Sequence, residues 1–172
     1  MDSNNEQSSL NVFWNKLQQL KFEITYLSLH FKRCVNISRT IKYVNVGLTT
    51  LSSSLLMCFS SIKPFVFSFS SFIIALQVFS AISKIFPYEK RQNELRELNN
   101  ELEDVYNRME YDWRILFNEN KTSSEINDYI NKYTSEISHL ERHYLKDDVL
   151  PEIKRIIQLA EQKTSDYFRN FI

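Results

Sequence analysis

Apolar residues recur at steps of three and four along the N-terminal part of the chain, with polar side chains between them. The apolar set is Leu10, Phe13, Leu17, Leu20, Ile24, Leu27, Phe31 and Cys34. This spacing places its members on one face of a helix. It predicts an amphipathic, cytoplasmic helix over residues 10–42 that packs against another helix. The polar segment 1–9 before it is expected to be a disordered tail.

The same spacing returns twice in the C-terminal half. One stripe comprises Leu95, Leu98, Leu102, Val105, Met109, Trp113 and Leu116, and the next comprises Ile126, Ile130, Tyr133, Ile137, Leu140 and Tyr144. Between them, Thr122-Ser123-Ser124-Glu125 has the form of a capping box, in which the Thr and Glu side chains each bond to the other residue's backbone N–H. The two stripes therefore predict a long antiparallel helical hairpin. Pro151 suits the first turn of a last helix, with Ile153, Ile156, Ile157 and Ala160 on one side.

Charged residues are absent from two adjacent stretches in the middle of the chain. Residues 43–62 and 64–83 contain no Lys, Arg, Asp or Glu, although 24% of the chain is charged. About 20 apolar residues in a helix span a bilayer core. We interpret 43–83 as a two-helix transmembrane hairpin that turns at Lys63-Pro64. The alternative is a pair of buried helices in a soluble bundle, because both stretches contain many Ser and Thr.

Basic residues flank the expected hairpin on one side. By the positive-inside rule, this asymmetry places both termini in the cytoplasm. The predicted fold class is an all-α membrane protein in which residues 84–172 form a cytoplasmic helical domain. The flanking residues are Arg33, Arg39 and Lys42 before the hairpin and Lys84, Lys90, Arg91 and Arg96 after it.

Polar side chains follow one side of each expected span. Small hydroxyl residues let helices pack closely in lipid, and the same face would line a pore if several hairpins formed a ring. A pore requires a homo-oligomer in the lipid bilayer, because one hairpin cannot enclose a channel. Packing and pore lining both stay open for these residues. They are Asn45, Thr49, Ser52, Ser53 and Ser60 in the first span and Ser70, Gln77, Ser80 and Lys84 in the second.

Composition argues against several functional classes. The one glycine, Gly47, disfavours P-loops, dinucleotide-binding units and nucleophile elbows, which need glycine at strained or crowded backbone positions. A net charge of zero argues against direct nucleic-acid binding by bulk electrostatics. His139 and His143 are spaced i, i+4, but they lie off the apolar stripe and are interpreted as solvated, as is His30. We predict neither an enzyme nor a cofactor or metal site.

The order of these parts resembles the SLATT domain, a two-transmembrane module of bacterial defence systems. The resemblance rests on the basic N-terminal helix, the two uncharged stretches, the charged helix from Glu89-Lys90-Arg91 to Trp113, the Thr/Ser turn and the break from Asp147 to Pro151. It implies a two-pass protein of the bacterial inner membrane that acts as a pore-forming effector of anti-phage defence. Its trigger would come from a separate sensor or nucleotide-signalling enzyme. The alternative is a membrane-anchored, non-enzymatic adaptor or scaffold whose cytoplasmic helices recruit a partner.

Overall fold

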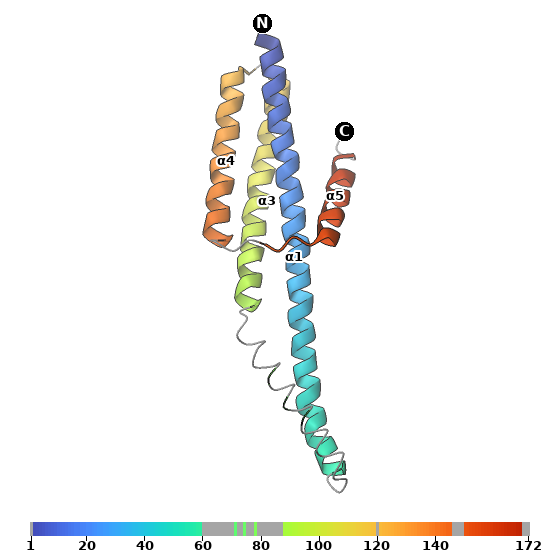
Figure 1. The fold of residues 1–172 in the computed structure, drawn as a ribbon. Coiled ribbons are helices and arrows are strands. Elements are labelled where there is room, and N and C mark those ends of the chain that lie inside the picture. Colours follow the sequence, from blue (N-terminus) through green and yellow to red (C-terminus); the bar gives the residue numbers. More distant parts are fainter. Residues whose placement is uncertain are drawn as a thin grey trace. The chain divides into compact units, whose positions relative to one another are not determined.

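The protein is built from α-helices. The computed structural model describes residues 2–59, 71, 74, 78, 88–119, 121–145 and 150–169. Its helices are α1 (Asp2–Phe59), α3 (Tyr88–Asn118), α4 (Ser123–Leu145) and α5 (Lys154–Arg169) (Figure 1). These residues contain no strand, in agreement with the all-α class. Because α1 already begins at Asp2, residues 2–9 are helical where the sequence predicts disorder.

The chain divides into two compact units. Unit 1 comprises Met1–Lys32 and Asn93–Ile172, and unit 2 comprises Arg33–Gln92. The boundaries predicted at residues 42–43 and 83–84 both fall inside unit 2. Within unit 2, the Gln92 side chain donates a hydrogen bond to the backbone carbonyl of Cys34 at 3.2 Å. The packed contacts among α1, α3, α4 and α5 belong to unit 1.

Two of the predicted heptad stripes form the core of unit 1. Contacts of Trp14 with Trp113 and of Lys21 with Tyr106 show that α1 and α3 run antiparallel. Their facing stripes exclude water, and apolar burial of this kind is the main force that holds helices together. The buried members are Phe13, Leu17, Leu20, Ile24 and Leu27 on α1 and Leu95, Leu98, Leu102, Val105, Tyr106, Met109 and Leu116 on α3.

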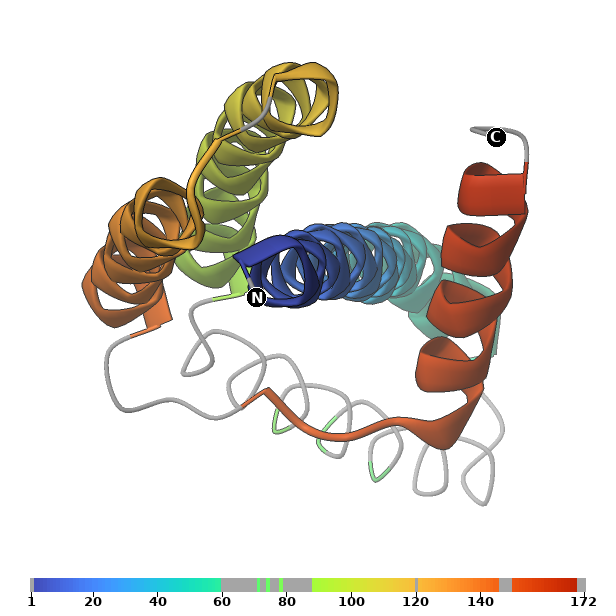
Figure 2. The ribbon, with the colours of Figure 1, turned by 90° about the horizontal axis from the view of Figure 1, so that it is seen from above.

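The other two helices lie on opposite sides of α1 (Figure 2). On one side, α4 buries Ile126 and Tyr133. On the other, α5 buries Ala160, Thr164 and Phe168, which recur every four residues. Unit 1 is therefore an α1–α3 pair with one further helix on each side.

The turn before α4 confirms the predicted capping box. The Thr122 backbone N–H donates to Glu125 Oε2 at 3.0 Å, and the Glu125 N–H donates to Thr122 Oγ1 at 3.4 Å. The neighbouring Ser123 hydroxyl lies 2.5 Å from that of Ser9, which is buried. This contact gives the polar N-terminal residues a tertiary partner, which is the physical reason for helix where disorder is expected.

The segment before α5 differs from its prediction in one respect. Pro151 precedes the helix instead of lying in its first turn, because α5 begins at Lys154. The carbonyl of Pro151 accepts a hydrogen bond from the Tyr26 hydroxyl of α1 at 3.1 Å. The connection into α5 is thereby attached to α1.

The predicted membrane-protein class, with its two-pass inner-membrane location, is wrong for the residues that the structure describes. Among them, no helix combines the length and the apolar character needed to cross a membrane. Helix α1 is long, but three Ser, two Thr and one Asn interrupt its apolar residues between Tyr43 and Phe59. The prediction relied on the absence of charge, which is a weaker condition than apolarity. Most of the second expected span, 64–83, lies outside the described residues.

Candidate functional site

A groove of about 460 Å³ opens between the N-terminal part of α1 and the C-terminal part of α3. Residues at i, i+3, i+4 and i+7 share one face of a helix, and the four α1 residues of the lining have this spacing. On α3 the lining residues lie within about one turn of each other. We call this set the aromatic groove: Gln7, Leu10, Asn11 and Trp14 of α1 with Trp113, Arg114 and Phe117 of α3.

Aromatic rings form a continuous row along the groove. The rings of Trp14 and Trp113 lie 4.6 Å apart between centroids, and Phe117 stacks on Trp113 at 5.2 Å. At the other end, Phe168 of α5 meets Trp14 edge to face at 5.2 Å. Contacts of this kind fix ring orientations and stabilise by about 0.5–1.5 kcal/mol beyond burial. Phe117 nevertheless keeps 62% of its surface exposed, so the row is ordered and also open.

Arg114 gives the groove its charge. It is the charged member of the seven lining residues described. Its Nη2 donates to Glu110 Oε1 at 2.7 Å, while 60% of the side chain stays exposed. An exposed pair of this kind contributes little to stability. Its main effect is to hold the guanidinium beside the rings of Trp113 and Phe117.

A second cluster holds α5 directly beside the groove. The Lys21 ammonium of α1 lies 4.5 Å from the ring centre of Tyr106 and 4.2 Å from that of Tyr167, an arrangement typical of cation–π attraction. The Tyr167 hydroxyl donates to Glu110 Oε2 at 3.3 Å. Burial raises the pKa of the Tyr106 phenol, which keeps it protonated. Glu110 therefore links α5 to Arg114 of the groove.

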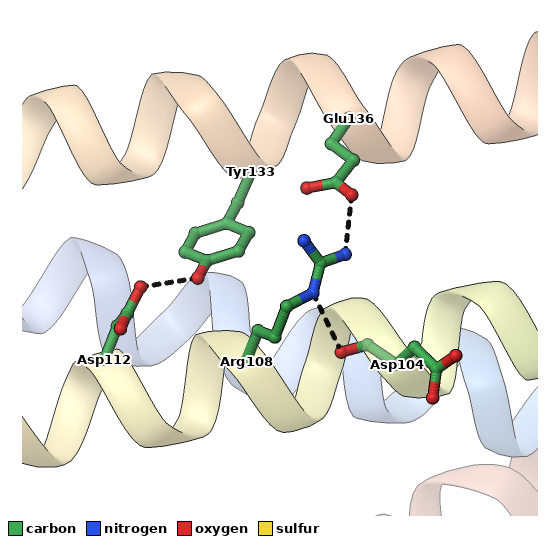
Figure 3. A network of polar contacts seen from close by, with 5 residues as sticks. All are labelled: Asp104, Arg108, Asp112, Tyr133 and Glu136. Carbon is green, nitrogen blue, oxygen red and sulfur yellow. Dashed lines mark hydrogen bonds and ion pairs between the residues drawn. The ribbon is translucent and has the colours of Figure 1, made fainter.

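On the far side of α1, a polar network joins α3 to α4 (Figure 3). The Tyr133 hydroxyl donates to Asp112 Oδ2 at 2.5 Å, and Arg108 Nη2 donates to Glu136 Oε1 at 2.6 Å. Arg108 Nε also bonds to the carbonyl oxygen of Asp104 at 3.4 Å. Burial, followed by the bond to Asp112, raises the pKa of Tyr133. These contacts attach α4 to α3.

A smaller cavity of about 200 Å³ lies between α1 and α4. Within it, Gln19 donates to Glu23 Oε1 at 2.9 Å. Burial raises the pKa of Glu23, and the negative charge of Glu141 acts in the same direction. Lys16 and the hydroxyls of Thr134 and Ser138 complete its polar lining. We interpret this cavity as the polar part of the α1–α4 interface.

The residues predicted to line a pore or an interhelical face stay untested. Asn45, Thr49, Ser52 and Ser53 lie on α1, but their side chains are outside the described part of the chain. The others lie wholly outside the described residues: Ser60, Ser70, Gln77, Ser80 and Lys84. The pore-forming effector, which depends on these side chains, remains a prediction from the polar faces of the two stretches and from the SLATT resemblance.

The histidines divide between confirmation and correction. His139 and His143 are exposed, as predicted. His30 is only 3% exposed and packs against the ring of Tyr26 at 4.6 Å, so its predicted solvated position is wrong. His30 lies one turn after Tyr26 on α1, outside the heptad stripe, so the spacing of the apolar residues does not predict its burial. In the part of the chain that is described, no three His, Cys, Asp or Glu side chains form a group that could hold a metal ion.

Sequence reasoning missed the aromatic groove. Trp113 was expected in the α3 core stripe, and Trp14 and Arg114 belonged to no predicted stripe or motif. One available signal was that both tryptophans of the chain lie near the same end of the expected α1–α3 pair. Comparison with protein-family models, with curated proteins and with solved structures finds no match to this chain.

Proposed function

We propose that the chain is a non-enzymatic helical adaptor that recruits a helical segment of a partner protein into the aromatic groove. The observation that carries this proposal is the ordered but open row of Trp14, Trp113 and Phe117, with Arg114 at its edge. Trp and Arg are enriched among the residues that contribute most of the binding energy at protein interfaces. An aromatic row that is already ordered also loses less entropy on binding.

The groove has the geometry that receives a helix. It lies between two antiparallel helices, and the adjacent part of the same α1–α3 surface already holds α5 through Phe168 and Tyr167. The buried residues of α5 recur every four residues, which is the spacing of one helix face. A partner helix with apolar anchors at such a spacing would dock by the helix-in-groove mode.

The lining chemistry supports binding more than catalysis. The seven side chains are two amides, one leucine, three aromatics and one guanidinium. None of these lining groups is a thiol, hydroxyl, imidazole or carboxylate, the groups that usually serve as nucleophile or general base. The aromatic groove can therefore hold an apolar segment and orient it by hydrogen bonds.

Selection from a displayed library of helical peptides against the full chain tests the proposal. We expect the enriched peptides to carry apolar residues at i, i+4 and i+7. Their affinity for the Phe117→Ser variant of the chain should be about tenfold or more lower than their affinity for the unmodified chain. Tyr111→Ser is the matched control, because Tyr111 is 65% exposed on the same helix and outside the groove lining. Failure to enrich any peptide whose binding depends on Phe117 would contradict the adaptor function.

A further inference from the structure

We infer that the segment bound in the aromatic groove is an acidic amphipathic helix, with a carboxylate that pairs with Arg114 in the turn nearest α5. This inference rests on the proposed adaptor function and adds the chemistry of the partner. It is carried by the charge of the lining, by the position of Arg114 and by the length of the groove along α1.

The charge of the lining selects an acidic partner. Among the lining residues that the structure describes, the six others are uncharged, so Arg114, which is paired with Glu110, is the charged group that faces a ligand there. A guanidinium has five N–H donors in one plane, and it can bind a partner carboxylate while it remains paired with Glu110. Attraction between opposite charges gives specificity even where it adds little affinity.

Desolvation strengthens this selection when the groove is filled. A helix lying over Trp113 and Phe117 would remove water from the neighbouring Arg114 side chain. Because charges attract more strongly where water is removed, a carboxylate on the incoming helix would add a second partner to the existing Arg114–Glu110 pair. A lysine at the same place would leave two like charges together, which disfavours basic segments.

Aromatic rings also attract cations, as the position of Lys21 between Tyr106 and Tyr167 illustrates. In that cluster Glu110 supplies a negative charge beside the rings. In the aromatic groove the neighbouring charge is the positive Arg114. These two aromatic clusters are therefore expected to prefer ligands of opposite sign.

The position of Arg114 indicates which turn of the bound helix carries the carboxylate. Arg114 pairs with Glu110, and Glu110 accepts the hydrogen bond from Tyr167 of α5. The acidic residue therefore belongs in the turn that faces α5. The α1 lining runs from Gln7 to Trp14, a rise of roughly 10 Å, which accommodates two turns of a bound helix.

Two tryptophan-free helical peptides that differ at one position test the inference. Both carry leucines at i, i+4 and i+7, and one has Glu where the other has Lys in the turn expected to face α5. Tryptophan emission of the full chain reports binding, because Trp14 and Trp113 are its two tryptophans and both line the groove. We expect the Glu peptide to bind about tenfold more tightly than the Lys peptide, and added salt to reduce this difference.

Arg114→Gln should remove the preference for Glu while both peptides still bind. Arg142→Gln is the matched control, because it removes the same charge from an exposed position on α4 and should keep the preference. Equal binding of the two peptides to the unmodified chain, or tighter binding of the Lys peptide, would overturn the acidic partner and leave the adaptor function standing.

Two other outcomes would also overturn the inference. If neither peptide binds while library selection still yields groove-dependent binders, the partner has a different chemistry. If binding appears only after Phe171→Ser, the occupant is the C-terminal segment of this chain. Circular dichroism of each variant, with helix content equal to that of the unmodified chain, shows that the comparison concerns folded protein.

Discussion

Helices α4 and α5 both pack on the α1–α3 pair, but the two are attached by different chemistry. Helix α4 has an acidic residue in its first turn and basic residues in its last, which matches the helix dipole. It also carries the capping box, the Tyr133–Asp112 bond and the Arg108–Glu136 pair. Helix α5 is shorter and begins with Lys154 and Arg155, the less favourable charge at a helix N-terminus.

The difference indicates that the two sides of the α1–α3 pair have different roles. Contacts to α4 extend from the Ser9–Ser123 pair near its start to the Arg108–Glu136 pair further along. On the other side, α5 ends next to Trp14, and the aromatic groove lies beyond it. The α1–α3 pair therefore uses one side for stability and keeps part of the other side open.

Tyr133→Ala should cause the largest loss of stability. Tyr133 is 2% exposed and meets Phe13 edge to face at 6.3 Å. Truncating a buried aromatic costs about 3–5 kcal/mol, whereas Tyr133→Phe removes only the hydroxyl contact and should cost about 1 kcal/mol. Urea unfolding followed by circular dichroism measures both values. Similar losses for the two variants would contradict the role of α4 as a packed structural element.

Phe168→Ala should release α5 at a smaller cost. Phe168 is 7% exposed and lies at the end of a short helix, so we expect a loss of about 2–3 kcal/mol. Hydrogen exchange should show faster exchange of α5 amides while α4 amides keep their protection. Leu159→Ala is the control, because Leu159 is 40% exposed on the same helix. Equal acceleration in α4 and α5 would show that the two helices unfold as one.

The features predicted correctly from the sequence are those that depend on neighbours along the chain. Heptad spacing identified the α1 and α3 core because residues three and four apart share a helix face. The capping box was found because its partners, Thr122 and Glu125, are three residues apart. Over the residues that the structure describes, the predicted transmembrane segment failed for a related reason, since absence of charge is a local pattern that does not measure apolarity.

The aromatic groove could not be predicted because it depends on contacts between distant segments. Trp113 occupies a heptad position and was expected in the core. Its partial exposure follows from the place where α5 ends, which the spacing of α3 does not encode. His30 shows the same limit on α1, because it is buried outside the heptad stripe, against the ring of Tyr26.

Thr164→Val should increase stability on the α5 side. The Thr164 hydroxyl is buried and has no hydrogen-bond partner among the described residues. Valine has nearly the same shape without the polar group, so the substitution removes a desolvation penalty and should stabilise by about 1 kcal/mol. Thr164→Ser keeps the hydroxyl, loses a methyl group and should destabilise. Thermal unfolding of the two variants measures the contrast, and a loss of stability in the valine variant would contradict the unpaired hydroxyl.

The smallest expected effect is the pH dependence of the α4 cap. The backbone N–H of Thr122, followed by its hydroxyl, lowers the pKa of Glu125 below 4.5. A lowered carboxylate pKa adds stability above the unfolded value, and this contribution disappears as the pH falls through the folded pKa. Glu125→Gln should therefore be less stable than the unmodified chain at pH 7, and the difference should disappear as the pH falls through the folded pKa of Glu125. Amide exchange in the first turn of α4 measures the change. Because no acidic residue lies in the first turn of α5, a matching change there would mean that the two helices do not differ in how they are anchored.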